Sequence, residues 1–287
     1  MTLKDIASLL EEKGIIDNAF IFRLFVEQEN KDKNLLPGKY KLLTGSDYQA
    51  VLDKITTGVS ETVYKLAIPE GYTVEETRDK ILTDIFFIEA ADLNAALDVG
   101  NYNYEFLKDK TTLEGFLFPK TYDVTIKNTA QNIVEMMLDQ YQLETGSLDY
   151  SYATENNFTP YDILIIASMI EEETYVPEER PKISAVIYNR LKINMLLQID
   201  ATVRYALNKW DGDLTLEDLE VDSPYNTYKY AGLPPIPICS PGLASIKAAL
   251  NPEDVDYLYY VVNDEVKHTH SFSNTLEEHE RNRNNTN

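Results

Sequence analysis

The sequence is poor in the residues that make covalent and metal cross-links. A single cysteine, Cys239, excludes an intrachain disulfide, and the three histidines, His268, His270 and His279, fit none of the usual Cys/His zinc spacings. We therefore expect neither a disulfide framework nor a structural metal. Uninterrupted apolar runs are short as well, since none approaches the roughly 18 residues that a membrane-spanning helix requires.

Positive charge is also scarce. The chain has 26 Lys and Arg residues against 48 Asp and Glu residues, which gives a formal net charge of −22. Such a balance repels a nucleic-acid backbone unless basic residues gather in one stripe, and the sequence contains no such stripe. Nucleic acid is therefore not an expected partner, and most acidic side chains are expected to form a solvated surface.

Length and apolar content indicate a folded protein of two unequal domains. The 287 residues are 44% apolar and include 20 Tyr and 10 Phe, which argues against disorder. We expect two domains of unequal size. Thr2 is placed to cap a helix that Gly14 ends, and the single residue before this cap is typical of a trimmed start.

Helical and strand patterns alternate along the chain, which predicts an α+β protein whose larger domain is mixed α/β. The longest helix is expected over residues 160–174, where an apolar run without internal Gly or Pro leads into three carboxylates. Thr73 and Glu76 form a capping box, which predicts another helix start. Further helices are expected after Gly45 and over 183–191, 200–207 and 243–250, strands at 39–43, 62–68 and 257–263, and a polar, frayed tail at 277–287.

The three carboxylates at the end of the long helix, Glu171, Glu172 and Glu173, point about 100° apart, so they cannot all face the same environment. A carboxyl group in an apolar site has a raised pKa, as a general acid requires near neutral pH. The alternative is a solvated helix end whose charges are compensated by Arg180 or Lys182. Apolar residues precede all three, so helical periodicity does not choose among them.

Several short motifs follow one another in the chain between residues 113 and 279. They are Leu113-Glu114-Gly115-Phe116-Leu117-Phe118-Pro119, Ala167 to Thr174, Glu179-Arg180, Val186-Ile187-Tyr188-Asn189-Arg190-Leu191, Leu197 to Tyr205, Tyr225-Asn226-Thr227-Tyr228, Gly232-Leu233-Pro234-Pro235, Pro241-Gly242, and His270-Ser271-Phe272-Ser273 with His279. Each motif is a weak signal alone, but in this order and spacing they closely resemble the YceG-like (MltG) family of endolytic murein transglycosylases.

The resemblance implies a lyase without a cofactor. Such an enzyme cuts the MurNAc-β-1,4-GlcNAc bond within peptidoglycan glycan strands, leaves a 1,6-anhydro-MurNAc end and terminates elongation of nascent strands. The family's catalytic glutamate corresponds to Glu171, the first of the triplet, and Glu173 becomes a supporting residue. One acid/base is enough in this chemistry, because the sugar's own C6 hydroxyl replaces water as the nucleophile.

The resemblance also implies a place of action. Members of the family carry an N-terminal membrane anchor, which is missing here, so the chain is expected to be the extracytoplasmic portion of a single-pass membrane protein. Residues 1–62 resemble the family's LysM-like module through Pro37-Gly38-Lys39-Tyr40, and this module could bind glycan or orient the enzyme. The resemblance places the catalytic domain over residues 63–287. The implied partners are peptidoglycan glycan strands and cell-wall synthases.

Further site residues are expected among polar groups that can hydrogen-bond a sugar. Each has a structural alternative: Asn226 could fix a turn, Tyr225 could belong to the core, and His270 could be a structural hydrogen-bonding group. Glu114 is either a partner of the site or a carboxylate paired with Arg190. The full set of substrate-binding or supporting candidates is Glu173, Glu114, Gln198, Asp200, Thr202, Tyr225, Asn226, Thr227 and His270.

The sequence departs from the family pattern at Lys120, Ala201 and Ile236, where Asp, Pro and Gly are usual. None of these touches Glu171, but they put a detailed transfer of loop roles in doubt. Two other functions compete with the lyase. One is a peptidoglycan-binding scaffold in which Glu171 is structural. The other is a pyridoxal-dependent lyase, which needs a Schiff-base lysine and a Gly-rich phosphate loop, and neither is recognisable here.

Overall fold

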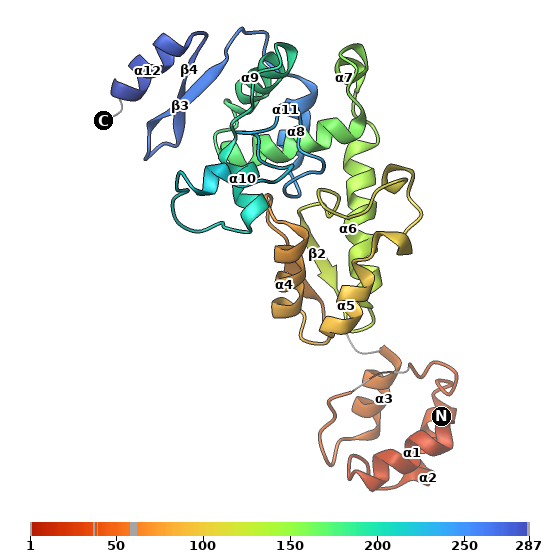
Figure 1. Ribbon diagram of the computed structural model, residues 1–287. Coiled ribbons are helices and arrows are strands. Elements are labelled where there is room, and N and C mark those ends of the chain that lie inside the picture. Colours follow the sequence, from red (N-terminus) through yellow and green to blue (C-terminus); the bar gives the residue numbers. More distant parts are fainter. Residues whose placement is uncertain (1, 37, 39, 58–61, 286–287) are drawn as a thin grey trace. The chain divides into compact units, whose positions relative to one another are not determined.

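The structure, a computed structural model, describes residues 2–36, 38, 40–57 and 62–285. The chain divides into two compact units, Met1–Thr62 and Val63–Asn287 (Figure 1). Each unit has its own hydrophobic core. No helix among these residues is long and apolar enough to cross a membrane.

The described residues of the first unit form helices α1 (Leu3–Glu12), α2 (Ala19–Gln28) and α3 (Tyr48–Thr57). Thr2 and Asp5 form a capping box at the start of α1, which confirms the helix expected there. The helices bury a shared core that includes Phe22.

The strand expected at residues 39–43 is wrong for residues 40–43, which are irregular, and Lys39 lies outside the described residues. Tyr40 packs against the core, and its hydroxyl donates to the Leu36 carbonyl (2.6 Å). Lys54 Nζ donates to the Lys41 carbonyl (3.2 Å). The Lys41 carbonyl is thus bonded to a side chain where a strand would use a neighbouring strand.

The second unit combines helices with two small antiparallel sheets, which confirms the α+β class. β1 (Tyr64–Ala67) pairs with β2 (Thr121–Val124), and β3 (Tyr259–Asp264) pairs with β4 (Thr269–Ser273). The α-helices are α4 (Val74–Asp84), α5 (Ala90–Ala96), α6 (Ala130–Thr145), α7 (Ser151–Glu155), α8 (Pro160–Glu173), α9 (Arg180–Lys192), α10 (Asp200–Leu207), α11 (Leu243–Leu250) and α12 (Leu276–Asn285), with short 3-10 turns at Val99–Asn101, Glu105–Leu107 and Asp218–Glu220.

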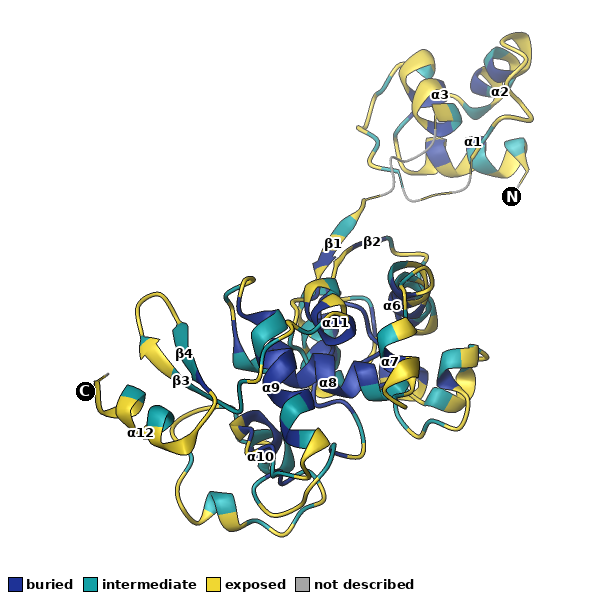
Figure 2. Ribbon diagram, turned by 90° about the horizontal axis from the view of Figure 1, so that it is seen from above, coloured by how far each residue is buried: buried dark blue, intermediate teal, exposed yellow. Residues whose placement is uncertain are grey.

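Helix α8 is the central element of this unit. It begins with a capping box between Thr159 and Asp162, carries Pro160 in its first turn, and is buried at every position from Ile163 to Glu171. It packs against α9, α10 and α11, and Figure 2 shows it in dark blue among these helices. Each fully buried aliphatic side chain of this kind stabilises the fold by about 2 kcal/mol. The residues at the end of α8 are therefore held on a rigid support.

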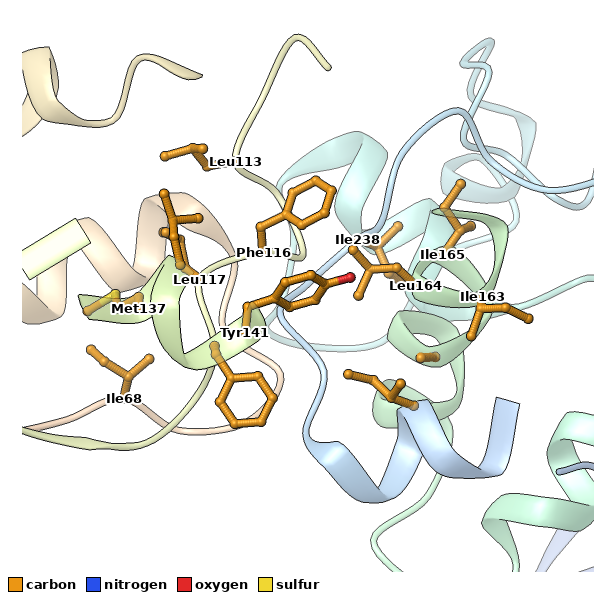
Figure 3. Close-up of a cluster of buried hydrophobic side chains, with 14 of the residues drawn as sticks. Ile68, Leu113, Phe116, Leu117, Met137, Tyr141, Ile163, Leu164, Ile165 and Ile238 are labelled. Atoms are coloured by element: carbon orange, nitrogen blue, oxygen red, sulfur yellow. The ribbon is translucent and has the colours of Figure 1, made fainter. Parts of the chain in front are cut away.

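The core continues from α8 to the segment 113–118 and to α6 (Figure 3). Gly115 has a φ of 85°, and a Cβ placed there would lie 2.7 Å from Pro237 side-chain atoms and 3.1 Å from Leu164. Only glycine allows this left-handed conformation and close approach without strain. The segment is thereby locked against α8, with its one carboxylate, Glu114, buried.

The tail expected to be frayed is instead the helix α12, which packs against β3 and β4; residues 286–287 lie outside the described part. Thr275 and Glu278 cap its start, since the Glu278 N–H donates to Thr275 Oγ1 (3.3 Å) and Glu278 Oε2 accepts from the Thr275 N–H (3.3 Å). The ring of His279 stacks on Tyr259 with centroids 5.4 Å apart. A capping box and one aromatic contact thus order a strongly polar segment.

Candidate active site

Glu171 occupies the last turn of α8, where its side chain is 8% exposed. Its Oε2 accepts a hydrogen bond from the backbone N–H of Gly242 (2.9 Å). Gly242 is the N-cap residue of α11, so this carboxyl lies at the positive end of a helix dipole. The fold therefore fixes the carboxyl in one orientation and leaves a small part of it accessible.

Arg180, the first residue of α9, supplies the positive charge beside this carboxyl. Its Nη2 lies 3.6 Å from Glu171 Oε1, and its Nε donates to Ser245 Oγ (3.1 Å). Lys182 instead lies over the ring of Phe272, 5.7 Å from its centroid. Of the two cations expected to compensate the triplet, Arg180 pairs with Glu171, and the pair is buried rather than solvated.

The other two carboxylates of the triplet point elsewhere. Glu172 lies against Gly71, where a Cβ would be 2.9 Å from its Oε1, and burial raises its pKa to about 7. Glu173 Oε2 accepts from the Tyr260 hydroxyl (2.7 Å), and burial raises its pKa as well. Glu173 thus connects α8 to strand β3.

Glu70 is a further acidic residue at this site, and no motif or periodicity in the sequence pointed to it. Its side chain packs against Gly242 so closely that a Cβ on Gly242 would overlap its carboxyl group. Burial and the nearby charge of Glu171 raise the pKa of Glu70, whereas Arg180 lowers it. Glu70, Glu171, Arg180 and Gly242 are called the Gly242 cluster below.

Glu114 connects α4 to α10. Its Oε1 accepts from the N–H of Val74 (3.1 Å), and its Oε2 accepts from the Tyr205 hydroxyl (3.3 Å). Burial raises its pKa to about 7. The pairing of Glu114 with Arg190 is wrong, because Arg190 donates instead to backbone carbonyls, among them that of Leu258 (2.6 Å).

Three polar candidates are enclosed in the protein. Thr227 Oγ1 accepts from the N–H of Ile199 (2.9 Å) and lies 2.9 Å from Thr202 Oγ1. Asn226 Nδ2 donates to the carbonyls of Leu219 and Val221, both at 2.8 Å. All three side chains are almost wholly buried, so the structure places them as supports of the loops around α10.

Three other candidates reach the surface. Gln198 and Asp200 are exposed, and the Tyr228 hydroxyl donates to Asp200 Oδ1. Tyr225 is half-buried, and its ring lies 5.0 Å from that of Tyr205. These groups are accessible to a ligand at the start of α10 and on the loop beside it.

His270 makes its contact with Glu179 rather than with Glu171. Its Nδ1 lies 2.7 Å from Glu179 Oε2, and its backbone N–H donates to Glu179 Oε1 (2.8 Å). Because Glu179 directly precedes Arg180, this pair fixes the start of α9 and with it the cation of the Gly242 cluster. His270 is therefore placed to act through Arg180.

The described residues contain no group of three or more His, Cys, Asp or Glu side chains suited to hold a metal ion. The chemistry available at the Gly242 cluster is that of carboxyl groups. Glu171 can exchange a proton with a ligand, Arg180 balances its charge, and Glu70 adds a second carboxyl nearby.

Comparison with known proteins bears on the whole chain. The YceG-like family model matches residues 1–285. An endolytic murein transglycosylase of Bacillus subtilis is 34% identical, over 96% of this chain and 79% of that protein. One of Streptococcus pneumoniae R6 is 29% identical over 98% of this chain, which spans 56% of its length. The crystal structure of a YceG-like protein from Listeria monocytogenes has a TM-score of 0.68 and 36% identity, covering 98% of this chain and 95% of that one. These matches confirm the resemblance, and the chain belongs to the YceG-like family.

Proposed function

We propose that this chain is a lytic transglycosylase that cleaves MurNAc-β-1,4-GlcNAc bonds within peptidoglycan strands and leaves 1,6-anhydro-MurNAc ends, with Glu171 as general acid and base. The observation that carries the proposal is the environment of Glu171, a nearly buried carboxyl group fixed by the Gly242 N–H and flanked by Arg180. The names of the relatives, endolytic murein transglycosylases, support the same reaction.

The reaction balances with one proton carrier. The protonated Glu171 carboxyl donates its proton to the glycosidic oxygen, and the bond between that oxygen and C1 of MurNAc breaks. The C6 hydroxyl of the same MurNAc then forms a bond to C1 and gives its proton to the Glu171 carboxylate. Glu171 is regenerated, no water is consumed, and the products are a GlcNAc with a free hydroxyl and an anhydro sugar.

The Gly242 cluster suits this shuttle, because the acid must hold its position while its proton leaves and returns. The Gly242 N–H and the Arg180 guanidinium are fixed by α11 and α9 and stabilise the carboxylate formed after the first transfer. Gln198, Asp200 and Tyr225 are accessible and can hydrogen-bond or stack on neighbouring sugars.

The substrate suggests the setting of the reaction. Peptidoglycan lies outside the cytoplasmic membrane, so we place the activity on that side, at the membrane where new strands are made. A cut within a nascent strand ends its elongation, which makes cell-wall synthases the protein partners to test. We propose that the unit Met1–Thr62 serves as the LysM-like module, which binds glycan or orients the catalytic unit.

The test is mass spectrometry of purified glycan strands after incubation with the wild-type chain, with Glu171→Gln and with the control Glu178→Gln. Glu178 is exposed and lies two residues before Arg180, outside the Gly242 cluster. We expect anhydro ends from the wild type and the control but none from Glu171→Gln. Cleavage by Glu171→Gln at the wild-type rate would refute the assignment, and binding of strands without cleavage by any variant would favour a scaffold.

A further inference from the structure

Glu70 lies on a short loop that is fixed against the segment leading to α11. The N–H of Gly71 donates to the Ser240 carbonyl (3.0 Å), and the N–H of Ser240 donates to the Tyr72 carbonyl (2.8 Å). Tyr72 and Ser240 thereby form an isolated antiparallel bridge. The backbone of Glu70 is consequently fixed relative to Gly242, two residues beyond Ser240.

Glu70 and Glu171 contact the same residue from different sides. The backbone N–H of Gly242 donates to Glu171, while the Glu70 carboxyl fills the space that a side chain at position 242 would occupy. A Cβ on Gly242 would also lie 2.9 Å from Glu70 Cγ. Gly242 has a φ of −71°, which any residue adopts, so the crowding at this position comes from the Glu70 side chain and not from the backbone conformation.

The Glu70 carboxyl has no partner that explains its position. It forms no hydrogen bond and no ion pair with any residue that the structure describes, although Arg180 is close enough to affect its titration. Its side chain remains exposed, beside the carboxylate of Glu171. Carboxylates whose pKa is shifted by partial burial and by a neighbouring charge concentrate at functional sites.

We infer that Glu70 is a second catalytic carboxylate, which faces the sugar cleaved by Glu171 and stabilises the positive charge of its transition state. This inference rests on the proposed function. As the bond from C1 to the glycosidic oxygen breaks, positive charge develops on C1 and the ring oxygen. Glu70 forms no bond and transfers no proton, so the atom balance given for Glu171 is unchanged.

The role predicts a specific dependence of kcat on pH. The charged groups that act on Glu70 are Glu171 of α8, which raises its pKa together with burial, and Arg180 of α9, which lowers it. Gly242 of α11 is uncharged. Glu70 must be ionised to act, so kcat falls as the pH drops through its raised pKa. The fall of kcat at alkaline pH, the alkaline limb, reports the proton donor of the reaction.

The first experiment compares kcat, KM and pH profiles of the wild type, Glu70→Gln, Glu70→Asp and the control Glu178→Gln. We expect Glu70→Gln to lower kcat on the order of 100-fold, the usual effect of removing one group that stabilises transition-state charge. KM and the fall of kcat at alkaline pH (the alkaline limb) should be unchanged, whereas the fall of kcat at acid pH (the acid limb) should disappear. Glu70→Asp, which keeps the charge, should recover part of the rate.

The second experiment uses Gly242→Ala, which changes no charge but displaces the Glu70 carboxyl. We expect it to lower kcat in the wild-type background and to have much less effect when Glu70 is already Ala. Such non-additivity in a double-mutant cycle shows that the two substitutions act on the same interaction. Equal effects in both backgrounds would contradict the inference.

The outcomes separate this inference from the proposed function. One outcome would overturn the role of Glu70 alone. In it, Glu171→Gln is inactive, whereas Glu70→Gln keeps the kcat of the wild type and the same fall of kcat at acid pH. Persistent activity in Glu171→Gln would overturn the proposed function. Loss of the alkaline limb in Glu70→Gln would make Glu70 the proton donor and would also overturn its role as a stabilising charge.

Discussion

The buried carboxyl of Glu114 makes the stability of the second unit dependent on pH. Burial raises its folded-state pKa from 4.5 to about 7, against the opposing hydrogen bonds from Val74 and Tyr205. The folded state therefore binds a proton that the unfolded state releases at lower pH. The stability that comes from the protonated form is fully present below pH 4.5 and is lost as the pH rises through about 7.

The size of this effect follows from the shift. At about 1.4 kcal/mol for each pH unit, a pKa raised from 4.5 to about 7 corresponds to about 3 kcal/mol. A unit of this length changes its melting temperature by roughly 2–4 °C for each kcal/mol, so the expected effect is roughly 6–12 °C. Glu172, with its pKa also raised to about 7, acts in the same direction.

Glu114→Gln removes this titration while keeping an oxygen that can accept from Val74. We expect its melting temperature relative to the wild type to increase steadily between pH 5 and pH 8, as measured by thermal denaturation followed by circular dichroism. Glu89→Gln, at an exposed site, should show no such trend. A difference between Glu114→Gln and the wild type that stays constant over this pH range would refute the reasoning.

Three further predictions concern activity and stability. Arg180→Met should lower kcat at least tenfold, because the carboxylate of Glu171 loses its buried counter-charge. Arg180→Lys, which keeps a positive charge, should recover part of kcat, and equal kcat in the two variants would contradict this. Ile166→Ala, in the core of α8, should lower the free energy of unfolding of the second unit by about 2–5 kcal/mol, as measured by urea denaturation. Ile193→Ala, at an exposed position, should change the free energy of unfolding little, and an equal loss in the two variants would contradict the central place of α8. Thr275→Ala should destabilise α12 by about 1 kcal/mol, seen as faster amide exchange confined to that helix, and unchanged exchange would disprove the cap.

The helices that build the site were largely readable from the sequence. The apolar run behind Pro160 predicted α8, and the expected bounds 200–207 and 243–250 agree with α10 and α11. Local signals suffice there, because caps, periodicity and helix-breaking residues lie within the segment itself. The strand expected near Tyr40 failed for the opposite reason, since a strand needs a partner that no local pattern supplies.

The tail shows a signal that was present but missed. Thr275 and Glu278 have the spacing of a capping box, yet the segment after them is so polar that it suggested disorder. Its helix depends on contacts with β3 and β4, among them the stack of His279 on Tyr259. Composition alone therefore underestimated the order at this end.

The site itself was only partly predictable. The resemblance selected Glu171, and the structure supplies a physical distinction within the triplet, because only Glu171 contacts both Gly242 and Arg180. Glu70 was out of reach, since its sequence neighbours are ordinary turn residues and its contact with Gly242 spans most of the second unit. Tertiary contacts between distant segments assign such roles, and one sequence does not encode them locally.

The most direct test of the central claim is to digest glycan strands with the wild-type chain in water labelled with heavy oxygen. A lyase that uses Glu171 as acid and base adds no water, so the new MurNAc ends should be anhydro sugars without the label. New reducing ends that carry the label, in place of anhydro ends and in excess of the label that a sample without enzyme takes up by exchange, would show that water attacks C1 and would contradict the account.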